Sequence, residues 1–399
     1  MRGQLRIITA QRARAVLGLI GLALGMSSCR NADDVALTGP VISAAATGLV
    51  FSQVSAGSTH NCGVTAASEV YCWGLNTYGA LGDGTTFDRW TPVLIAGGLR
   101  FSQVSAGIYN TCGVTVDYIA YCWGSGDFGG LGNGATNDRL IPEPVAGGLQ
   151  FRQIETYFHT CGVSYPDDRV YCWGYNPEGQ LGDGTVETHL TPVPIVGTYR
   201  FRQIAAGIAH TCGVTTDNRA YCWGRNTAGQ VGDGTEVAFR EAPTPVAGDY
   251  SFREVDLGQD HSCGVTTKNK AYCWGNGTHG QIGSGKPDMS FRPRLVSGGL
   301  SFGRLTAGVY HTCGTTTLNQ AYCWGTNEYG QLGDGTGLDR LRPGGVAGGL
   351  SFAQVSAGGF HTCAYLLEGA AYCWGSNWAG QVGDGTTENR FTPVPVADP

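Results

Sequence analysis

The sequence has no sustained helical period beyond its N-terminus, while Gly supplies 65 of its 399 residues. Frequent glycine divides a chain into short segments joined by turns, which favours strands over long helices. These two features exclude a helical bundle. We therefore expect an all-β body.

Common catalytic signatures are also missing. No His-Glu-x-x-His pair occurs, and no unique cysteine and histidine pair stands outside the repeats described below. One segment places Gly280, Gly285 and Lys286 in the register of a phosphate-binding loop, but Pro287 stands where that motif needs Ser or Thr. The prediction is a protein that is not an enzyme and that uses no cofactor and no metal.

The chain has little positive charge after its first residues. Its formal net charge of −6 becomes −10 without residues 1–28, because that segment holds four arginines and no acidic residue. No basic cluster follows Cys29 that could hold an anionic membrane surface. Nucleic acid is therefore excluded as a partner, and any membrane contact would come from a lipid anchor alone.

The N-terminus has the features of an export signal. Four arginines precede an apolar run from Ala15 to Met26, and these twelve residues are too few to span a bilayer. The following Ser27-Ser28-Cys29 resembles a bacterial lipoprotein signal, although Met26 replaces the usual Leu. We expect a signal at 1–28, lipidation of Cys29, a tether at 29–48 and one folded body at 49–399. The alternative is an ordinary signal peptide with an incidental cysteine, and on either interpretation the protein is exported to the cell envelope or beyond.

A seven-fold internal repeat organises the body. Each copy has two cysteines, with Tyr before the second and Trp-Gly after it, and the first cysteines recur every 49 to 51 residues. The pairs are Cys62/Cys72, Cys112/Cys122, Cys161/Cys172, Cys212/Cys222, Cys263/Cys273, Cys313/Cys323 and Cys363/Cys373. Zinc sites need groups of four ligands at closer spacing, so seven hairpin disulfides are favoured over metal or free thiols.

Each repeat predicts four short strands, which we name A to D. In the fourth copy these are Phe201–Gly207, His210–Thr215, Arg219–Gly224 and Pro243–Val246. Seven such units favour a seven-bladed β-propeller with four-stranded antiparallel blades, since a linear solenoid would need polar end caps that the terminal copies lack. Proline in strand D predicts an edge position. If D pairs with the next A, Pro393–Val396 would complete the first blade.

The repeat resembles the regulator-of-chromosome-condensation family. The resemblance rests on Ala206–Thr211, Trp223–Asn226 and Gly229–Gly234 and recurs from Phe51 to Val396. It implies a seven-bladed propeller but not one function, since members serve as exchange factors, inhibitors and interaction scaffolds. The paired cysteines are an addition to the usual pattern.

Three repeated residue types are expected to be structural. Six copies carry His before the first cysteine and one carries Asn110, a substitution that indicates hydrogen bonding, not metal binding. Gly-Asp-Gly-Thr segments, such as the one at Asp233, predict turns. The tryptophan after each second cysteine should fill space between blades.

Aromatic residues that break the repeat are the candidate binding site. The A–B and C–D connections should leave one face of the propeller, and the B–C turns, mostly polar as at Asp217 and Lys268, should leave the other. The candidates are Tyr109, Tyr157, Phe158, Tyr310 and Phe360 on A–B loops, and Tyr78, Phe128, Tyr175, Tyr329 and Trp378 on C–D loops. Tyr157 and Phe158 are the strongest, because the third A–B segment is one residue shorter than the others.

The function that these features favour is a non-catalytic, monomeric binding scaffold of the bacterial cell envelope. Its partner would be a protein or a glycan that contacts the aromatic loop face. Three alternatives stay open: a guanine-nucleotide exchange factor, a secreted enzyme inhibitor and a glycan-binding lectin. The exchange factor fits an exported chain poorly, because its GTPase partner is intracellular.

Overall fold

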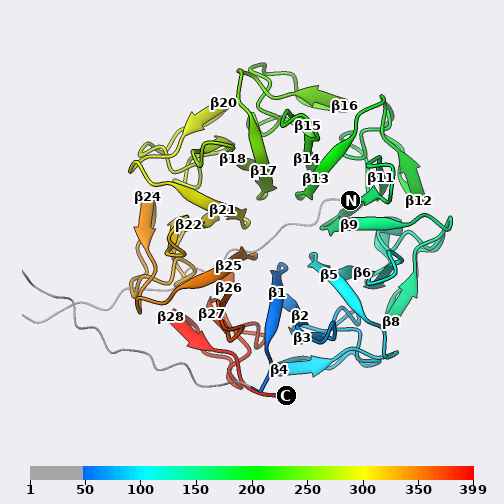
Figure 1. The fold of residues 1–399 in the computed structure, drawn as a ribbon, viewed down its shortest axis with the longest axis vertical. Helices are drawn as coiled ribbons and strands as arrows, with labels where there is room; N and C mark the ends of the chain where they lie inside the picture. Colours follow the sequence, from blue (N-terminus) through cyan, green and yellow to red (C-terminus); the bar gives the residue numbers. More distant parts are fainter. Residues whose placement is uncertain (1–47) are drawn as a thin grey trace, which may run out of the picture. The chain divides into compact units, whose positions relative to one another are not determined.

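The computed structural model describes residues 48–399 as a ring of seven four-stranded antiparallel sheets (Figure 1). The seven-bladed all-β propeller expected from the repeats is therefore confirmed. The export signal, Cys29 and tether residues 30–47 lie outside the described range. Within that range no helix is long and apolar enough to cross a membrane.

Each blade is one repeat, and its strands run outward in chain order. The innermost strands A are β1 (Phe51–Ala56), β5 (Phe101–Ala106), β9 (Phe151–Thr156), β13 (Phe201–Ala206), β17 (Phe252–Leu257), β21 (Phe302–Ala307) and β25 (Phe352–Ala357). Strands B are β2 (His60–Thr65), β6 (Asn110–Thr115), β10 (His159–Ser164), β14 (His210–Thr215), β18 (His261–Thr266), β22 (His311–Thr316) and β26 (His361–Leu366).

The two outer strands complete each blade. Strands C are β3 (Val70–Gly74), β7 (Ala120–Gly124), β11 (Val170–Gly174), β15 (Ala220–Arg225), β19 (Ala271–Gly275), β23 (Ala321–Gly325) and β27 (Ala371–Gly375). Strands D are β4 (Arg89–Leu94), β8 (Arg139–Pro144), β12 (His189–Pro194), β16 (Phe239–Pro245), β20 (Ser290–Leu295), β24 (Arg340–Gly345) and β28 (Arg390–Pro395). A 3-10 turn, η1 (Asp127–Gly129), interrupts the second C–D loop.

The last strand does not complete the first blade, so that expectation is wrong. β28 pairs with β27 of its own repeat, with Cys373 opposite Val394. The same C–D pairing occurs in every blade and leaves D at the outer edge, where proline costs no ladder hydrogen bond. The last and first blades are instead joined by backbone bonds, such as Phe51 N–H to the Gly369 carbonyl at 2.9 Å, and by side chains that cross between blades.

The seven predicted disulfides all form within hairpins B–C, and their pairing is confirmed. In each blade the first cysteine lies in strand B directly opposite the second in strand C, as Cys212 is to Cys222, with Cα atoms 4.0 to 4.1 Å apart. The bridges are Cys62–Cys72, Cys112–Cys122, Cys161–Cys172, Cys212–Cys222, Cys263–Cys273, Cys313–Cys323 and Cys363–Cys373. The turn after Cys212 is tight because Asn218 adopts a left-handed φ of 68°. Seven buried bridges indicate that the chain matures in an oxidising environment.

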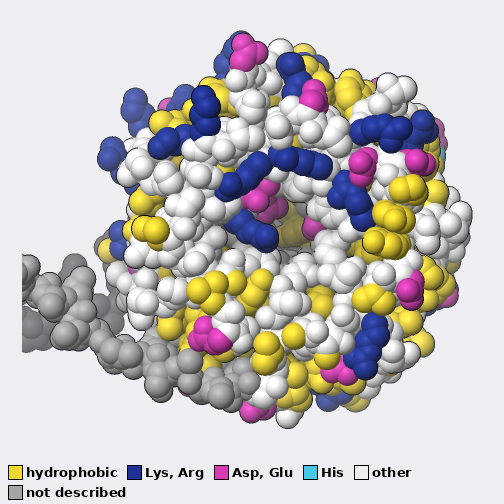
Figure 2. Space-filling model, in the orientation of Figure 1, with side chains coloured by type: hydrophobic (Ala, Val, Ile, Leu, Met, Phe, Trp, Pro, Cys, Tyr) yellow, Lys and Arg dark blue, Asp and Glu magenta, His cyan; other side chains and the backbone are white. Residues whose placement is uncertain are grey.

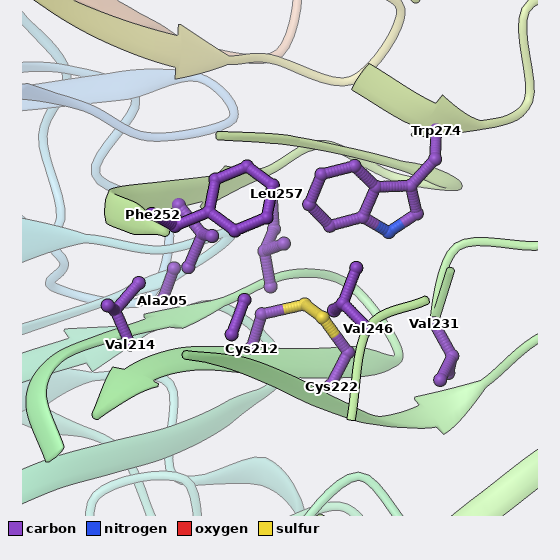
Figure 3. Close-up of a cluster of buried hydrophobic side chains, with 11 residues drawn as sticks. Ala205, Cys212, Val214, Cys222, Val231, Val246, Phe252, Leu257 and Trp274 are labelled. Atoms are coloured by element: carbon purple, nitrogen blue, oxygen red, sulfur yellow. A yellow bond between two sulfur atoms is a disulfide. The ribbon is translucent and has the colours of Figure 1, made fainter. Parts of the chain in front are cut away.

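The hydrophobic core lies between blades and includes the disulfides. Trp274 of the fifth blade packs over the Cys212–Cys222 bridge of the fourth, beside Phe252 and Leu257 (Figure 3). Its indole Nε1 donates to the Gln230 carbonyl at 2.9 Å. The seven repeated tryptophans are all fully buried in this way, which confirms their space-filling role.

Glutamine side chains join neighbouring strands A around the ring. The amide of Gln53 donates to the Val104 carbonyl and accepts from the Val104 N–H, both at 2.9 Å. Gln103, Gln153 and Gln203 hold the next blades in the same way, and Gln354 closes the ring by pairing with Val54. We call each of these two-bond contacts a glutamine clasp. Glu254 and Arg304 occupy the two remaining clasp positions.

Histidines form a second ring of bonds between blades. His261 Nε2 lies 2.9 Å from Thr312 Oγ1, and that hydroxyl donates to the Gln281 carbonyl. The hydroxyl must therefore accept from the imidazole, so Nε2 of His261 carries a proton, while the buried Nδ1 has no hydrogen-bond partner among the described residues, as expected for a neutral ring. Burial lowers the pKa of His261 to about 3, in agreement with this state. Five other histidines make the equivalent bond, and Asn110 bonds Thr156 at 2.7 Å, as its amide predicts.

Candidate functional site

The C–D loops are built on a repeated polar framework. Asn76 Oδ1 accepts from the Leu81 N–H at 2.9 Å, while its amide group donates to the Thr85 carbonyl at 3.0 Å. Asp83 accepts from the Thr85 N–H and forms an ion pair with Arg89 at 2.7 Å. Burial alone would raise the pKa of Asp83, but the hydrogen bonds from Thr85 and Arg89 outweigh it and lower the pKa. The Gly-Asp-Gly segments are therefore turn and loop supports, as predicted.

The A–B and C–D loops meet on one face, which we call the loop face. Tyr78 from the first C–D loop contacts Tyr109 from the second A–B loop, with ring centroids 5.1 Å apart. Across the ring, Phe360 lies 6.0 Å from Tyr310 and 5.6 Å from Tyr329. Trp378 is 60% exposed and stands apart from these groups. The structure thus brings most of the candidate aromatic residues together in small clusters.

A pocket lies at the boundary between the second and third blades. It has a volume of about 90 Å³, and its wall includes Tyr109, Phe128 and Phe158. These three side chains are 41%, 48% and 37% exposed. Tyr175 backs the pocket, with its ring 4.7 Å from Phe128 and 6.2 Å from Phe158.

Three departures from the repeat converge on this pocket. Asn110 replaces the histidine of the other blades and lines the pocket. Gly126 replaces the asparagine that supports most C–D loops, and the loop instead forms η1, where Phe128 has a left-handed φ of 56°. The shortened third A–B segment supplies Phe158. A bulky non-glycine residue in this backbone region is unfavourable and is found where the surroundings enforce it.

Tyr157 does not belong to the exposed surface, although it was paired with Phe158 as the strongest candidate. It lines both the pocket and the central channel of the propeller, and its hydroxyl hydrogen-bonds the side chain of Ser58 in the first blade. Burial raises the pKa of Tyr157. The shortened loop therefore places Tyr157 across the loop-face end of the channel and leaves Phe158 at the surface.

The opposite face is less polar than the sequence suggested. Tyr118 and Tyr165, on the B–C turns of the second and third blades, stack at 4.1 Å with an interplanar angle of 4°. Leu318 and Leu367 are 75% and 63% exposed on other B–C turns. We call this side the turn face. Aromatic content alone therefore does not distinguish the two faces.

The central channel has a volume of about 220 Å³, and its charged lining residues come from one side of the ring. Glu155, Glu254, Asp256 and Arg304 line it from blades three, five and six, where most other blades present Gln or Ser. Burial raises the pKa of Glu155 and of Glu254 to about 7, and that of Asp256 to about 6. Among residues 48–399 no group of three or more His, Cys, Asp or Glu side chains could hold a metal ion.

The fourteen paired cysteines support the site but do not form part of it. All of them are fully buried, and none lines the pocket or the channel. Each strand-C cysteine directly precedes one of the buried tryptophans; these cysteines are Cys72, Cys122, Cys172, Cys222, Cys273, Cys323 and Cys373. The strand-B cysteines are Cys62, Cys112, Cys161, Cys212, Cys263, Cys313 and Cys363. The bridges therefore hold the blades on which the loops stand and leave recognition to the loops.

Taken together, the described residues define a disulfide-stapled, closed β-propeller with an aromatic pocket on its loop face. Comparison with protein families gives the assignment. Residues 22–306 match the RCC1-like domain, and residues 319–365 and 368–399 match the regulator of chromosome condensation (RCC1) repeat. The chain therefore belongs to the RCC1-like domain family.

Similarity to individual proteins is limited to the fold or to short segments. A 44-residue stretch is 43% identical to the human E3 ubiquitin-protein ligase HERC2 and covers 11% of this chain and 1% of that protein. Human WBSCR16 has a TM-score of 0.75 at 21% identity, over 83% of this chain and 95% of that one. Prp20p from Saccharomyces cerevisiae has a TM-score of 0.73 at 19% identity, over 87% of each chain. These likenesses establish the propeller fold.

Proposed function

We propose that this protein is a non-catalytic binding scaffold that engages a macromolecular partner through the pocket between its second and third blades. The convergence of Asn110, η1 and the shortened third A–B loop carries this proposal. A symmetric ring needs none of these departures for stability, since the other blades fold without them. Exposed Tyr109, Phe128 and Phe158 supply rigid aromatic surface of the kind that dominates binding energy.

The proposed location is the bacterial cell envelope, with a lipid anchor on Cys29. Seven buried disulfides support an exported protein, because reducing compartments do not maintain such bridges. The same bridges count against an intracellular exchange factor. Prp20p, whose structure was described with its binding to Gsp1p and histones, shares the fold at 19% identity, which does not transfer that activity.

The test compares two surfaces of equal aromatic character. Wild-type protein and a Phe128→Ala/Phe158→Ala variant would be used to capture partners from envelope extracts, with Tyr118→Ala/Tyr165→Ala as a matched turn-face control. Selective loss of the captured partner in the loop-face variant is the expected result, by ~2 kcal/mol or more per hot-spot residue. Equal loss in the control variant would remove the pocket as the binding site.

The location has its own test. Mass spectrometry of the membrane fraction should detect a lipidated N-terminal peptide beginning at Cys29, and Cys29→Ala should release the protein from the membrane. Recovery of unmodified, soluble protein with an intact Met1 would contradict the envelope location without bearing on the pocket.

A further inference from the structure

Arginine side chains gather around the turn-face end of the central channel. Arg202 and Arg253 are the second residues of β13 and β17, and Arg304 is the third residue of β21. Figure 2 shows Lys and Arg side chains around the central opening, over the β9, β13, β17 and β21 side of the ring. The first two blades have Ser52 and Ser102 instead. We call Arg202, Arg253 and Arg304 the arginine arc.

The arc has far fewer acidic partners than the other arginines of the propeller. The neighbouring Arg152 is neutralised by Asp168 at 2.7 Å, and outer-strand arginines pair with Asp83, Asp334 and Asp384. Within the arc, Arg202 donates to the Phe252 carbonyl and Arg253 to the Phe302 carbonyl, both at 2.8 Å. These bonds fix the guanidinium groups without cancelling their charge.

Two donor groups of the arc are free. The buried Nε of Arg202 has no hydrogen-bond partner among the described residues. The guanidinium group of Arg304, an exposed residue, forms no hydrogen bond or ion pair with the described residues 48–399. Guanidinium groups present planar pairs of N–H donors, which match the oxygens of carboxylate and phosphate groups.

The local charge is positive even though the chain is acidic. Burial lowers the pKa of Arg202, and the nearby Arg253 lowers it further, so these two cations repel each other. Within the described part of the chain, Glu254 is the carboxylate that interacts with all three arginines, and burial holds its pKa at about 7. Three cations thus share one carboxylate that is partly protonated at neutral pH. An added anion would relieve this imbalance.

The depth of the site follows from the strand register. Asp256 lies two residues beyond Glu254 in β17, and Glu155 lies at the equivalent depth in β9. Each raises the electrostatic cost of an anion that enters further, and Tyr157 covers the far end of the channel. An anion would therefore stop at the arc, where the channel opens.

We infer that the arginine arc at the turn-face mouth of the channel is a binding site for an oxyanion group, carboxylate or phosphate. A free small anion and the acidic side chains of a peptide are the two sources of this chemistry. The site lies on the face opposite the aromatic pocket and does not depend on the proposed function.

Isothermal titration calorimetry at fixed ionic strength would test the site with three probes: inorganic phosphate, citrate and a hexaglutamate peptide. The key variant is Arg304→Gln, because Gln is the clasp residue of most other blades and should preserve the fold. Loss of one charge-assisted contact should weaken binding about tenfold or more. Arg292→Gln on outer strand β20 removes the same charge from an exposed arginine that has no side-chain partner among residues 48–399, and it should leave binding unchanged.

Glu254→Gln provides a second, opposite test. It removes the carboxylate that competes for the arc, so it should tighten probe binding several-fold. Binding of phosphate and citrate but not hexaglutamate identifies a free anion, and preference for hexaglutamate identifies an acidic peptide. Failure of all three probes to bind wild-type protein overturns the inference. Equal weakening by Arg304→Gln and Arg292→Gln, or weaker binding by Glu254→Gln, also overturns it.

Discussion

Glu254→Gln should stabilise the propeller at alkaline pH. Glu254 Oε1 accepts from the Leu305 N–H at 3.0 Å, as the clasp glutamines do at their neighbours. A glutamine amide also donates to the neighbouring carbonyl, whereas Glu254 can do so only when it is protonated. The clasp between the fifth and sixth blades therefore forms both of its hydrogen bonds only when Glu254 is protonated.

The sign of the pH dependence follows from the direction of the shift. Burial raises the pKa of Glu254 from 4.5 to about 7. Glu254 then binds more protons in the folded protein than in the unfolded chain between these values, so its contribution to stability is greatest below pH 4.5 and falls as the pH rises through 7. This trend is the reverse of that for an ion-paired carboxylate. A shift of this size corresponds to at most about 3 kcal/mol, which includes the hydrogen bond that Glu254 loses on ionisation.

Differential scanning calorimetry at pH 4.5 and pH 8 would measure the effect. The Glu254→Gln variant should unfold several degrees above wild type at pH 8 and at nearly the same temperature at pH 4.5. The pKa values of Glu155 and Asp256 are also raised by burial. Wild type and variant should therefore both lose some stability between pH 4.5 and pH 8. An unchanged or lower unfolding temperature at pH 8 would refute the proton-dependent clasp.

Three further outcomes are expected. Arg304→Gln should complete the clasp to Val355 and raise the free energy of unfolding by about 1 kcal/mol, measured in denaturant, and a loss of stability would contradict this. Cys212→Ala/Cys222→Ala should lower it by ~2–3 kcal/mol, and alkylation before and after reduction should show fourteen protected cysteines. Asn110→His should restore the histidine ring and fill the pocket, so partner capture should fall while the unfolding temperature holds; unaffected capture would exclude the pocket.

Repetition made the fold predictable. A single hairpin with two cysteines is ambiguous, but seven copies at constant spacing specify the number of blades, the four strands of each blade and the disulfide pairing, although not the radial order of the strands. The wrong prediction was that the last strand, β28, would complete the first blade, and it has a physical cause. The D–A turns look like hairpin turns, yet the D strand hydrogen-bonds backward to C, as Cys373 and Val394 do. Local turn chemistry does not reveal which of two neighbouring strands receives the backbone bonds.

The candidate site was predictable only in part, because exposure depends on neighbours from other blades. Tyr157 and Phe158 are adjacent aromatic residues on one loop. The sequence does not reveal which of the two side chains is buried and which is exposed. The distinction comes from Ser58, about a hundred residues away, which binds Tyr157 across the channel. The departures at Asn110 and Gly126 were visible in the sequence, but only the ring shows that they border the same pocket.

The arginine arc also could not be recognised from the sequence read along the chain. A search for basic clusters along the chain finds none, because Arg202, Arg253 and Arg304 are about fifty residues apart, one per blade. In a propeller, however, residues at equal positions in successive repeats become neighbours around the channel. The meaningful sequence is then the one read across repeats: Gln53, Gln103, Gln153, Gln203, Glu254, Arg304 and Gln354. Read in this direction, two adjacent blades replace a neutral clasp with opposite charges, and function is expected where the structural rule is broken.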